Sequence, residues 1–290
     1  MTQSPVAEIF CDGNEKVGWG HIRRSSALAA RLEKEGIGVR VSGLSESASR
    51  MLPTPKYLGG PARVAVFDSH VGIDDQIRAA HEGGQTTVAL DWFGETIPNI
   101  NIAVYPHGEV RATRQAYVGF QYILIREEIA VLHRTPPTGR AKRVLVVIGG
   151  SDLLGQGPEA ARRLRDEGHD VTLIRGPLAK GIVADVGYRV LVNPPELPQL
   201  LASCDWAVTN GGGCLFEALC VGKAAFVLPQ TSEELKIARF AEEHGAVLGI
   251  GLERLRSFQP GEVRVVSECG LELVDGRGVE RVSSIIRGLL

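Results

Sequence analysis

The sequence predicts an α/β protein made of two doubly wound domains with parallel sheets. Short β-branched runs alternate with helical patterns along the chain of 290 residues, which is typical of parallel strands joined by crossover helices. A polar segment at residues 133–140 contains two prolines and a glycine and interrupts this alternation. We therefore expect a linker there, between Rossmann-like domains at residues 1–136 and 137–290.

Each domain is expected to contribute six strands. In the first they lie near residue 9 and at residues 39–41, 64–67, 87–90, 102–104 and 122–124. In the second they begin at residue 143 and continue at 171–174, 190–192, 206–209, 225–228 and 246–249. Ligands of such sheets bind beyond the carboxyl ends of the strands, so glycine-rich turns after strands are expected to face a cleft between the domains.

The composition favours a small-molecule partner. A formal net charge of −2 leaves no basic surplus for nucleic acid, and the 44% hydrophobic and 23% charged residues are typical of a globular protein. Five cysteines without a C-x-x-C pair, no apolar run of about 18 residues and no signal-like N-terminus predict a cytoplasmic protein without stable membrane insertion. No histidine lies at metal-ligand spacing, so neither a metal nor another cofactor is expected. Nothing in the sequence indicates an oligomeric state.

The first glycine turn ends the first strand and opens a helix. Gly18 and Gly20 allow a tight turn and a close approach to a ligand. His21 then falls in the first helical turn, where free amides attract an anion and the helix dipole favours a neutral imidazole, suited to a general base. The alternative is an ordinary strand-to-helix turn with an exposed histidine.

Two carboxylates follow buried strands in the same half. Asp68 and Asp91 would point from the strand ends toward the cleft, where they bind sugar hydroxyls or orient His21. The alternative for each is a helix cap or an Asx turn. His70, next but one to Asp68, competes with His21 for the role of base.

Two further glycine turns lie in the second half. Gly149, Gly150 and Ser151 follow the first strand there, and their amides are candidates for a phosphate, unless Ser151 or Asp152 only caps the next helix. Gly211, Gly212 and Gly213 form a stronger phosphate candidate.

Glu217 lies about one turn into the helix that follows these three glycines. A carboxylate there can accept two hydrogen bonds from a ribose. The alternative is a first-turn Glu that only complements the helix dipole.

Together these segments resemble the UDP-sugar hydrolases of the pseudaminic acid pathway and their relatives of spore-coat polysaccharide biosynthesis, which share the glycosyltransferase-B fold. The resemblance spans most of the chain. It rests on Asp12 with Gly18, Trp19, Gly20, His21 and Arg24, on Asp68, on the segment 122–128, on Gly149 to Asp152, on Gly211 and Gly212 with Glu217, and on Gly222 before the strand that ends at Pro229.

This resemblance implies hydrolysis at the anomeric carbon of a UDP-linked amino sugar, with inversion and release of UDP. His21 would activate the water, Asp12 and Arg24 would join the substrate site, and the glycine turns with Glu217 would hold the nucleotide. The chain departs from the family at Glu233 and Glu234, where an Asn-Gln pair is usual, and at Lys223, commonly proline. An inverting glycosyltransferase and a non-catalytic nucleotide-sugar-binding protein are the alternatives.

Overall fold

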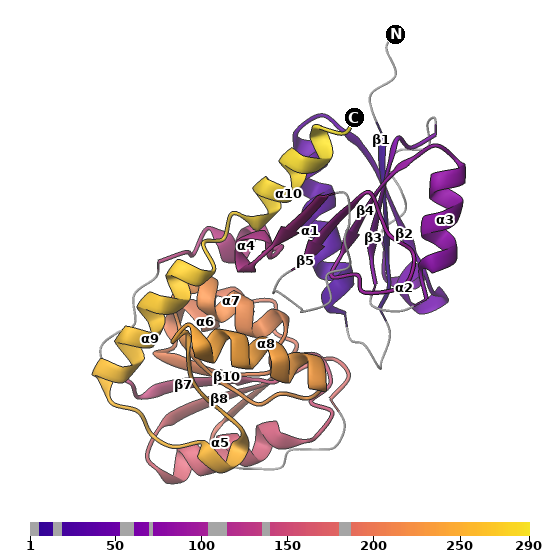
Figure 1. Ribbon diagram of the computed structural model, residues 1–290. Helices are drawn as coiled ribbons and strands as arrows, with labels where there is room; N and C mark the ends of the chain where they lie inside the picture. The colour runs from indigo at the N-terminus through magenta and orange to yellow at the C-terminus, as the bar shows by residue number, and fades with distance from the viewer. Residues whose placement is uncertain are drawn as a thin grey trace. The chain divides into compact units, whose positions relative to one another are not determined.

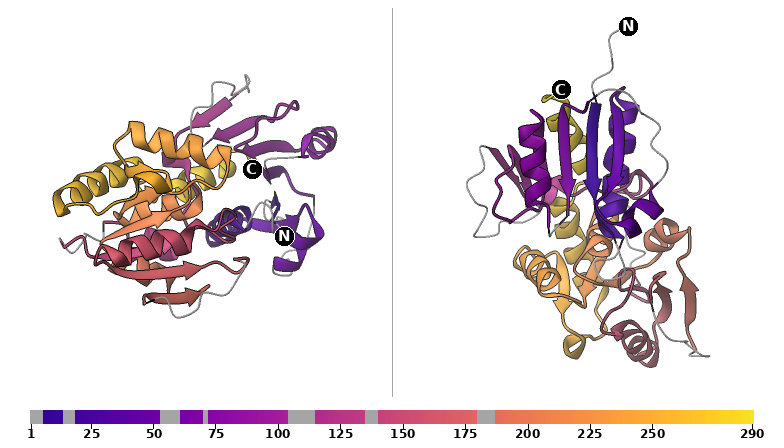
Figure 2. Two further views of the ribbon diagram at one scale, coloured as in Figure 1. Left: turned by 90° about the horizontal axis from the view of Figure 1, so that it is seen from below. Right: turned by 90° about the vertical axis from the view of Figure 1, so that its right-hand side faces the viewer.

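The computed structural model describes residues 6–13, 19–52, 61–69, 72–103, 115–134, 140–179 and 187–290. The chain divides into two compact units, one formed by Met1–Arg126 with Arg277–Leu290 and the other by Glu127–Gly276 (Figures 1 and 2). Each unit contains a six-stranded parallel sheet flanked by helices, which confirms the predicted class of two doubly wound α/β domains. This division differs from the expected ranges 1–136 and 137–290, because the C-terminal segment packs in the first unit.

The sheet of the first unit has the strand order β2-β1-β3-β4-β5-β6, with every neighbouring pair parallel. Its strands are β1 (Val6–Cys11), β2 (Gly38–Gly43), β3 (Val64–Asp68), β4 (Thr86–Leu90), β5 (Ile100–Ala103) and β6 (Gln115–Val118). Its helices are α1 (Gly20–Lys34), α2 (Glu46–Met51), α3 (Asp74–Glu82), the 3-10 helix η1 (Phe120–Tyr122) and α10 (Gly278–Arg287).

The expected strand at residues 122–124 is wrong. Gly119, at φ 130°, ends β6, and the chain then turns through η1 instead of continuing in the sheet. The apolar residues Ile123 and Ile125 are nevertheless buried, both 4% exposed. Their apolar pattern therefore reports a buried connection between core elements and not a strand.

Residues of the central strands alternate between two buried faces. Val64 and Val66 pack with residues of α1 and α10, whereas Ala65 and Phe67 pack with residues of α3. Helices α1 and α10 contact each other on the first of these faces (Figure 1). A parallel sheet covered on both faces has apolar residues in succession, which is why β3 is buried along its whole length.

The sheet of the second unit has the order β12-β11-β10-β7-β8-β9, again parallel throughout. Its strands are β7 (Arg143–Val147), β8 (Asp170–Arg175), β9 (Arg189–Val192), β10 (Trp206–Thr209), β11 (Ala224–Val227) and β12 (Val247–Ile250). Its helices are α4 (Glu127–Ala130), α5 (Gln156–Asp166), α6 (Leu197–Ser203), α7 (Gly213–Val221), α8 (Ser232–Glu243), η2 (Leu252–Arg254) and α9 (Pro260–Leu273).

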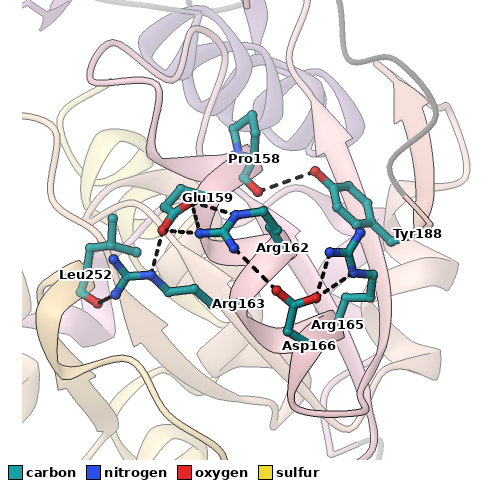
Figure 3. Close-up of polar contacts among 8 residues, drawn as sticks. All are labelled: Pro158, Glu159, Arg162, Arg163, Arg165, Asp166, Tyr188 and Leu252. Atoms are coloured by element: carbon teal, nitrogen blue, oxygen red, sulfur yellow. Dashed lines mark hydrogen bonds and ion pairs between the residues drawn. The ribbon is translucent and has the colours of Figure 1, made fainter.

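The outer face of α5 carries a chain of ion pairs and hydrogen bonds (Figure 3). Glu159 accepts from Arg162 and Arg163, and Asp166 accepts from Arg162 and Arg165. Arg163 also donates to the carbonyl of Leu252 at 3.0 Å, and so links α5 to η2. These arginines are partly exposed and paired with carboxylates or a carbonyl, as on a solvated helix surface, where each such pair adds little stability.

Candidate functional site

The candidate residues of the first unit lie at one end of its sheet. The chain passes from β1 to β2 on one side of β1 and then crosses back to β3 on the other side, so the strand order reverses between β1 and β3. Crevices at such reversals, outside the carboxyl ends of the strands, are the usual ligand sites of doubly wound sheets. His21 follows β1 in the first turn of α1, Asp68 is the last residue of β3, and Asp91 follows β4.

His21 and Asp68 form a close pair at this reversal. The Nδ1 atom of His21 lies 2.6 Å from Oδ1 of Asp68, and Asp68 is fully buried while His21 is 9% exposed. Because the carboxylate only accepts, Nδ1 carries the proton and donates it, and a neutral ring then has its lone pair on Nε2. A histidine oriented in this way by a carboxylate is the usual arrangement of a general base.

Arg24 keeps Asp68 ionised in this buried place. Its Nε atom donates to Oδ2 of Asp68 at 2.9 Å, its Nη2 atom donates to Oδ1 at 2.5 Å, and its Nη1 atom donates to Asp91 at 2.8 Å. Burial alone raises the pKa of Asp68, but the charge of Arg24 and the hydrogen bonds from His21 and Arg24 outweigh it and hold that pKa well below its usual range. At Arg24, burial lowers the pKa of the guanidinium, but the charges of Asp68 and Asp91 outweigh burial and raise that pKa.

The predicted substrate ligands of this unit are thus largely engaged with one another. Asp68 also accepts from Ser25 Oγ at 2.8 Å, and Asp12 accepts from Ser45 Oγ at 2.6 Å. Gly20 opens α1, and a Cβ there would meet nothing within 4 Å. Contact of Asp12, Gly20, Arg24, Asp68 and Asp91 with a substrate stays a prediction. Gly18 and His70 lie outside the described residues.

The candidate glycine turns of the second unit also meet where strand order reverses, here between β7 and β10. Gly149 follows β7 at φ 60°, and a Cβ on it would lie 3.1 Å from Nδ2 of Asn210, which follows β10. The turn at Gly149 and Gly150 and the turn at Gly211 to Gly213 are therefore neighbours. Their role in binding a nucleotide stays a prediction, as does that of Ser151.

Asp152 caps α5 from the first of these turns. Its carboxylate accepts from the amides of Gln156 and Gly157, both at 2.9 Å. This matches the capping alternative for that residue, and it leaves those two amides already bonded. Any phosphate at this turn would therefore be held by amides that precede α5.

The helix α8 packs closely on the second turn. A Cβ at Gly211 would lie 2.3 Å from the carbonyl oxygen of Glu234, so only glycine fits there. At Gly213, the first residue of α7, a Cβ would meet nothing within 4 Å. Glu217 lies one turn further into α7 and is partly buried. Packing against α8 thus explains the glycine at position 211, whereas the space beside Gly213 is unoccupied by protein atoms.

Sequence reasoning missed several residues that shape these sites: Ser25, Ser45, Asn210 and Gln230. Ser25 lies one turn after His21 on α1, a spacing that puts both on one side of the helix. Gln230 follows β11 and bridges loops, donating to the carbonyl of Leu228 and accepting from the amide of Leu154. Its position close to the carboxyl end of a buried strand was a usable signal.

Within the described ranges, no group of three or more His, Cys, Asp and Glu side chains could hold a metal ion. The helices in these same ranges include none that is long and apolar enough to cross a membrane.

Two six-stranded parallel sheets with helices, each with its candidate residues at a strand-order reversal, define a glycosyltransferase-B fold. Solved structures with this fold match nearly the whole chain. MurG of Acinetobacter baumannii has a TM-score of 0.64 at 12% identity over 99% of this chain and 100% of that one. A UDP-N-acetylglucosamine 2-epimerase has a TM-score of 0.60 at 15% identity over 99% of this chain and 96% of that one.

Two curated proteins are distant homologues. The spore coat polysaccharide biosynthesis protein SpsG of Bacillus subtilis is 24% identical over 216 residues, which are 66% of this chain and 62% of SpsG. A Helicobacter pylori protein, named pseudaminic acid cytidylyltransferase and UDP-2,4-diacetamido-2,4,6-trideoxy-β-L-altropyranose hydrolase, is 20% identical over 284 residues. That match covers 94% of this chain and 54% of the relative, so the chain spans only part of both proteins. No family model matches the chain.

Proposed function

We propose that this protein hydrolyses a UDP-linked amino sugar, with His21 as the general base. The observation that carries the proposal is the 2.6 Å contact between His21 Nδ1 and the buried Asp68 carboxylate. It leaves Nε2 of a neutral imidazole to accept a proton, at the end of the sheet where ligands of this architecture bind. The name of the H. pylori relative, which includes a UDP-sugar hydrolase, supports the choice of reaction.

In the proposed reaction, Nε2 of His21 takes a proton from water while the water oxygen bonds to the anomeric carbon. The bond from that carbon to the diphosphate oxygen breaks, and UDP leaves with the electron pair. Asp68 stabilises the imidazolium that forms, because it is held ionised by Arg24. In the second unit, the turns at Gly149 and Gly213 and the carboxylate of Glu217 are proposed to hold a nucleotide.

The proposal is tested by incubating the protein with a panel of UDP-amino sugars and measuring UDP release without an acceptor. His21→Ala is expected to lower turnover by about 100-fold or more while UDP binding by calorimetry persists. His21→Asn, which retains a donor for Asp68, should be equally inactive. His81→Ala, on α3 of the same unit, is the matched control and should retain activity.

Other outcomes identify other functions. UDP release that requires an added acceptor would reject hydrolysis and indicate a glycosyltransferase. Binding of UDP-sugars without turnover, with or without acceptor, would indicate a non-catalytic binding protein.

A further inference from the structure

The carboxylate of Glu234 occupies an anion-binding position in the second unit. Its Oε2 atom accepts from the amide of Gln230 at 2.8 Å and from the amide of Gly211 at 3.3 Å. Its Oε1 atom accepts from Nδ2 of Asn210 at 2.5 Å. Donors from the loops after β10 and β11 thus converge on one negatively charged group.

The neighbouring carboxylate shows that this placement is particular to Glu234. Glu233 points elsewhere, because its Oε1 atom accepts from Nζ of Lys236 at 2.7 Å and its side chain is 55% exposed. The first turn of α8 therefore sends one carboxylate into solvent and the other into the glycine turn. Gly211 allows this approach, since any side chain there would collide with the backbone of Glu234.

Two buried polar atoms beside this position lack a hydrogen-bond partner among the described residues. In the part of the chain that the structure describes, neither Oγ1 of Thr209 nor Oδ1 of Asn210 has a hydrogen-bond partner, although both atoms are buried. Thr209 is fully buried at the end of β10. Buried polar atoms without partners are rare in folded proteins, and here two of them adjoin the turn that Glu234 fills.

We propose that Glu234 is a specificity-determining residue of the nucleotide site, because its carboxylate takes the amides that a ligand phosphate would otherwise use. This inference rests on the proposed function, which places a nucleotide diphosphate at these turns. A diphosphate must displace Glu234 or bind beside its negative charge, whereas an uncharged nucleoside meets no such competition. The site therefore binds UDP less tightly than its donors would allow, which favours release of the product.

The test compares UDP, uridine and inorganic pyrophosphate by calorimetry on the full chain. Glu234→Gln removes the charge at nearly constant volume and is expected to tighten UDP and pyrophosphate binding by about tenfold, leaving uridine unchanged. Glu234→Ala frees the same amides and should act in the same direction. Glu242→Gln, on the same helix and paired with Arg254, is the control and should bind all three ligands as the wild type does.

Unfolding temperatures of the same variants test the alternative that Glu234 only fastens two loops together. Loss of stability in both Glu234 variants with UDP affinity unchanged or weakened would overturn the inference while leaving the proposed function intact. Absence of UDP binding in the wild type and in every variant would overturn the proposed function as well.

Discussion

Asp68 is the residue on which the first site depends. It is a fully buried carboxylate that accepts from His21, Arg24 and Ser25. An unpaired charge in such a place would be costly, but here every donor comes from α1, within two turns of one helix. The cluster therefore fixes both the ionisation of Asp68 and the orientation of the His21 ring.

Asp68→Asn is expected to lower turnover without a matching rise in KM, because the ring of His21 loses its charged partner. It should also lower the free energy of unfolding by about 3 kcal/mol, the scale of breaking a buried ion pair. The folded pKa lies below the ordinary value of 3.8, so this contribution is present above that pH and disappears as the pH falls toward the folded pKa.

Denaturant unfolding at neutral and acidic pH measures this prediction, with Asp75→Asn as the control. Asp75 is exposed and pairs only at the surface with Arg78. An equal loss of stability for Asp68→Asn at both pH values would contradict the linkage.

At the scale of elements, α7 and the turn before it combine packing with openness. The helix is buried on nearly all sides, and its N-terminal glycines meet quite different surroundings. Gly211 is enclosed by α8, whereas Gly213 faces open space. Close packing against α8 therefore requires glycine at position 211, whereas no packing contact requires it at position 213.

Alanine substitution separates these requirements. Gly211→Ala should destabilise the second unit by about 2 kcal/mol or more, because the new Cβ would lie 2.3 Å from a backbone oxygen that cannot move freely. Gly213→Ala should leave the unfolding temperature nearly unchanged but weaken UDP binding, since its Cβ would extend into the proposed phosphate position. Thermal unfolding and calorimetry on both variants measure this. Equal effects on stability would refute the distinction.

Strand periodicity predicted most of the two sheets, since buried parallel strands are short, continuous apolar runs such as Val64–Asp68. It failed at residues 122–124, because a buried connection has the same composition as a strand. Likewise, turn chemistry located His21, Asp68 and Gly211 and offered Asp68 as a residue that orients His21, as the 2.6 Å contact between them shows. It did not find Ser25 as a further donor to Asp68, or the packing of Glu234 on Gly211. The pairing of Glu234 with Asn210 depends on how α8 meets a loop 24 residues away, which no local pattern encodes.

At the scale of the whole molecule, the second unit is an insertion in the chain of the first. Helix α10 returns to the first unit after 150 residues and completes its core, where Val282 and Ile286 are fully buried. Arg281 fastens the helix further by donating to the carbonyl of Gln121 at 2.8 Å. The expected boundary at residue 136 took no account of this return, because an amphipathic terminal helix fits either domain.

Ile286→Ala is expected to destabilise the first unit by about 3 kcal/mol, as for other aliphatic side chains removed from a packed core. Hydrogen exchange, read separately for the two units, should show faster opening of β1 and β3. Val265→Ala on the exposed side of α9 is the control, since that side chain is 55% exposed. Faster exchange confined to the second unit would contradict the assignment of α10.

The chain passes from one unit to the other at two points, after Arg126 and after Gly276, and the segments that flank these points are neighbours. A Cβ at Gly278 would lie 2.0 Å from the carbonyl oxygen of Ile123, and one at Gly276 would lie 3.7 Å from Cβ of Ala130. While the second unit is folded, it holds the two ends of its own chain together. When the second unit unfolds, the first unit must instead close a flexible loop formed by Glu127–Gly276, at an entropic cost on the order of 4 kcal/mol. The folded state of each unit thus depends on the other through chain entropy.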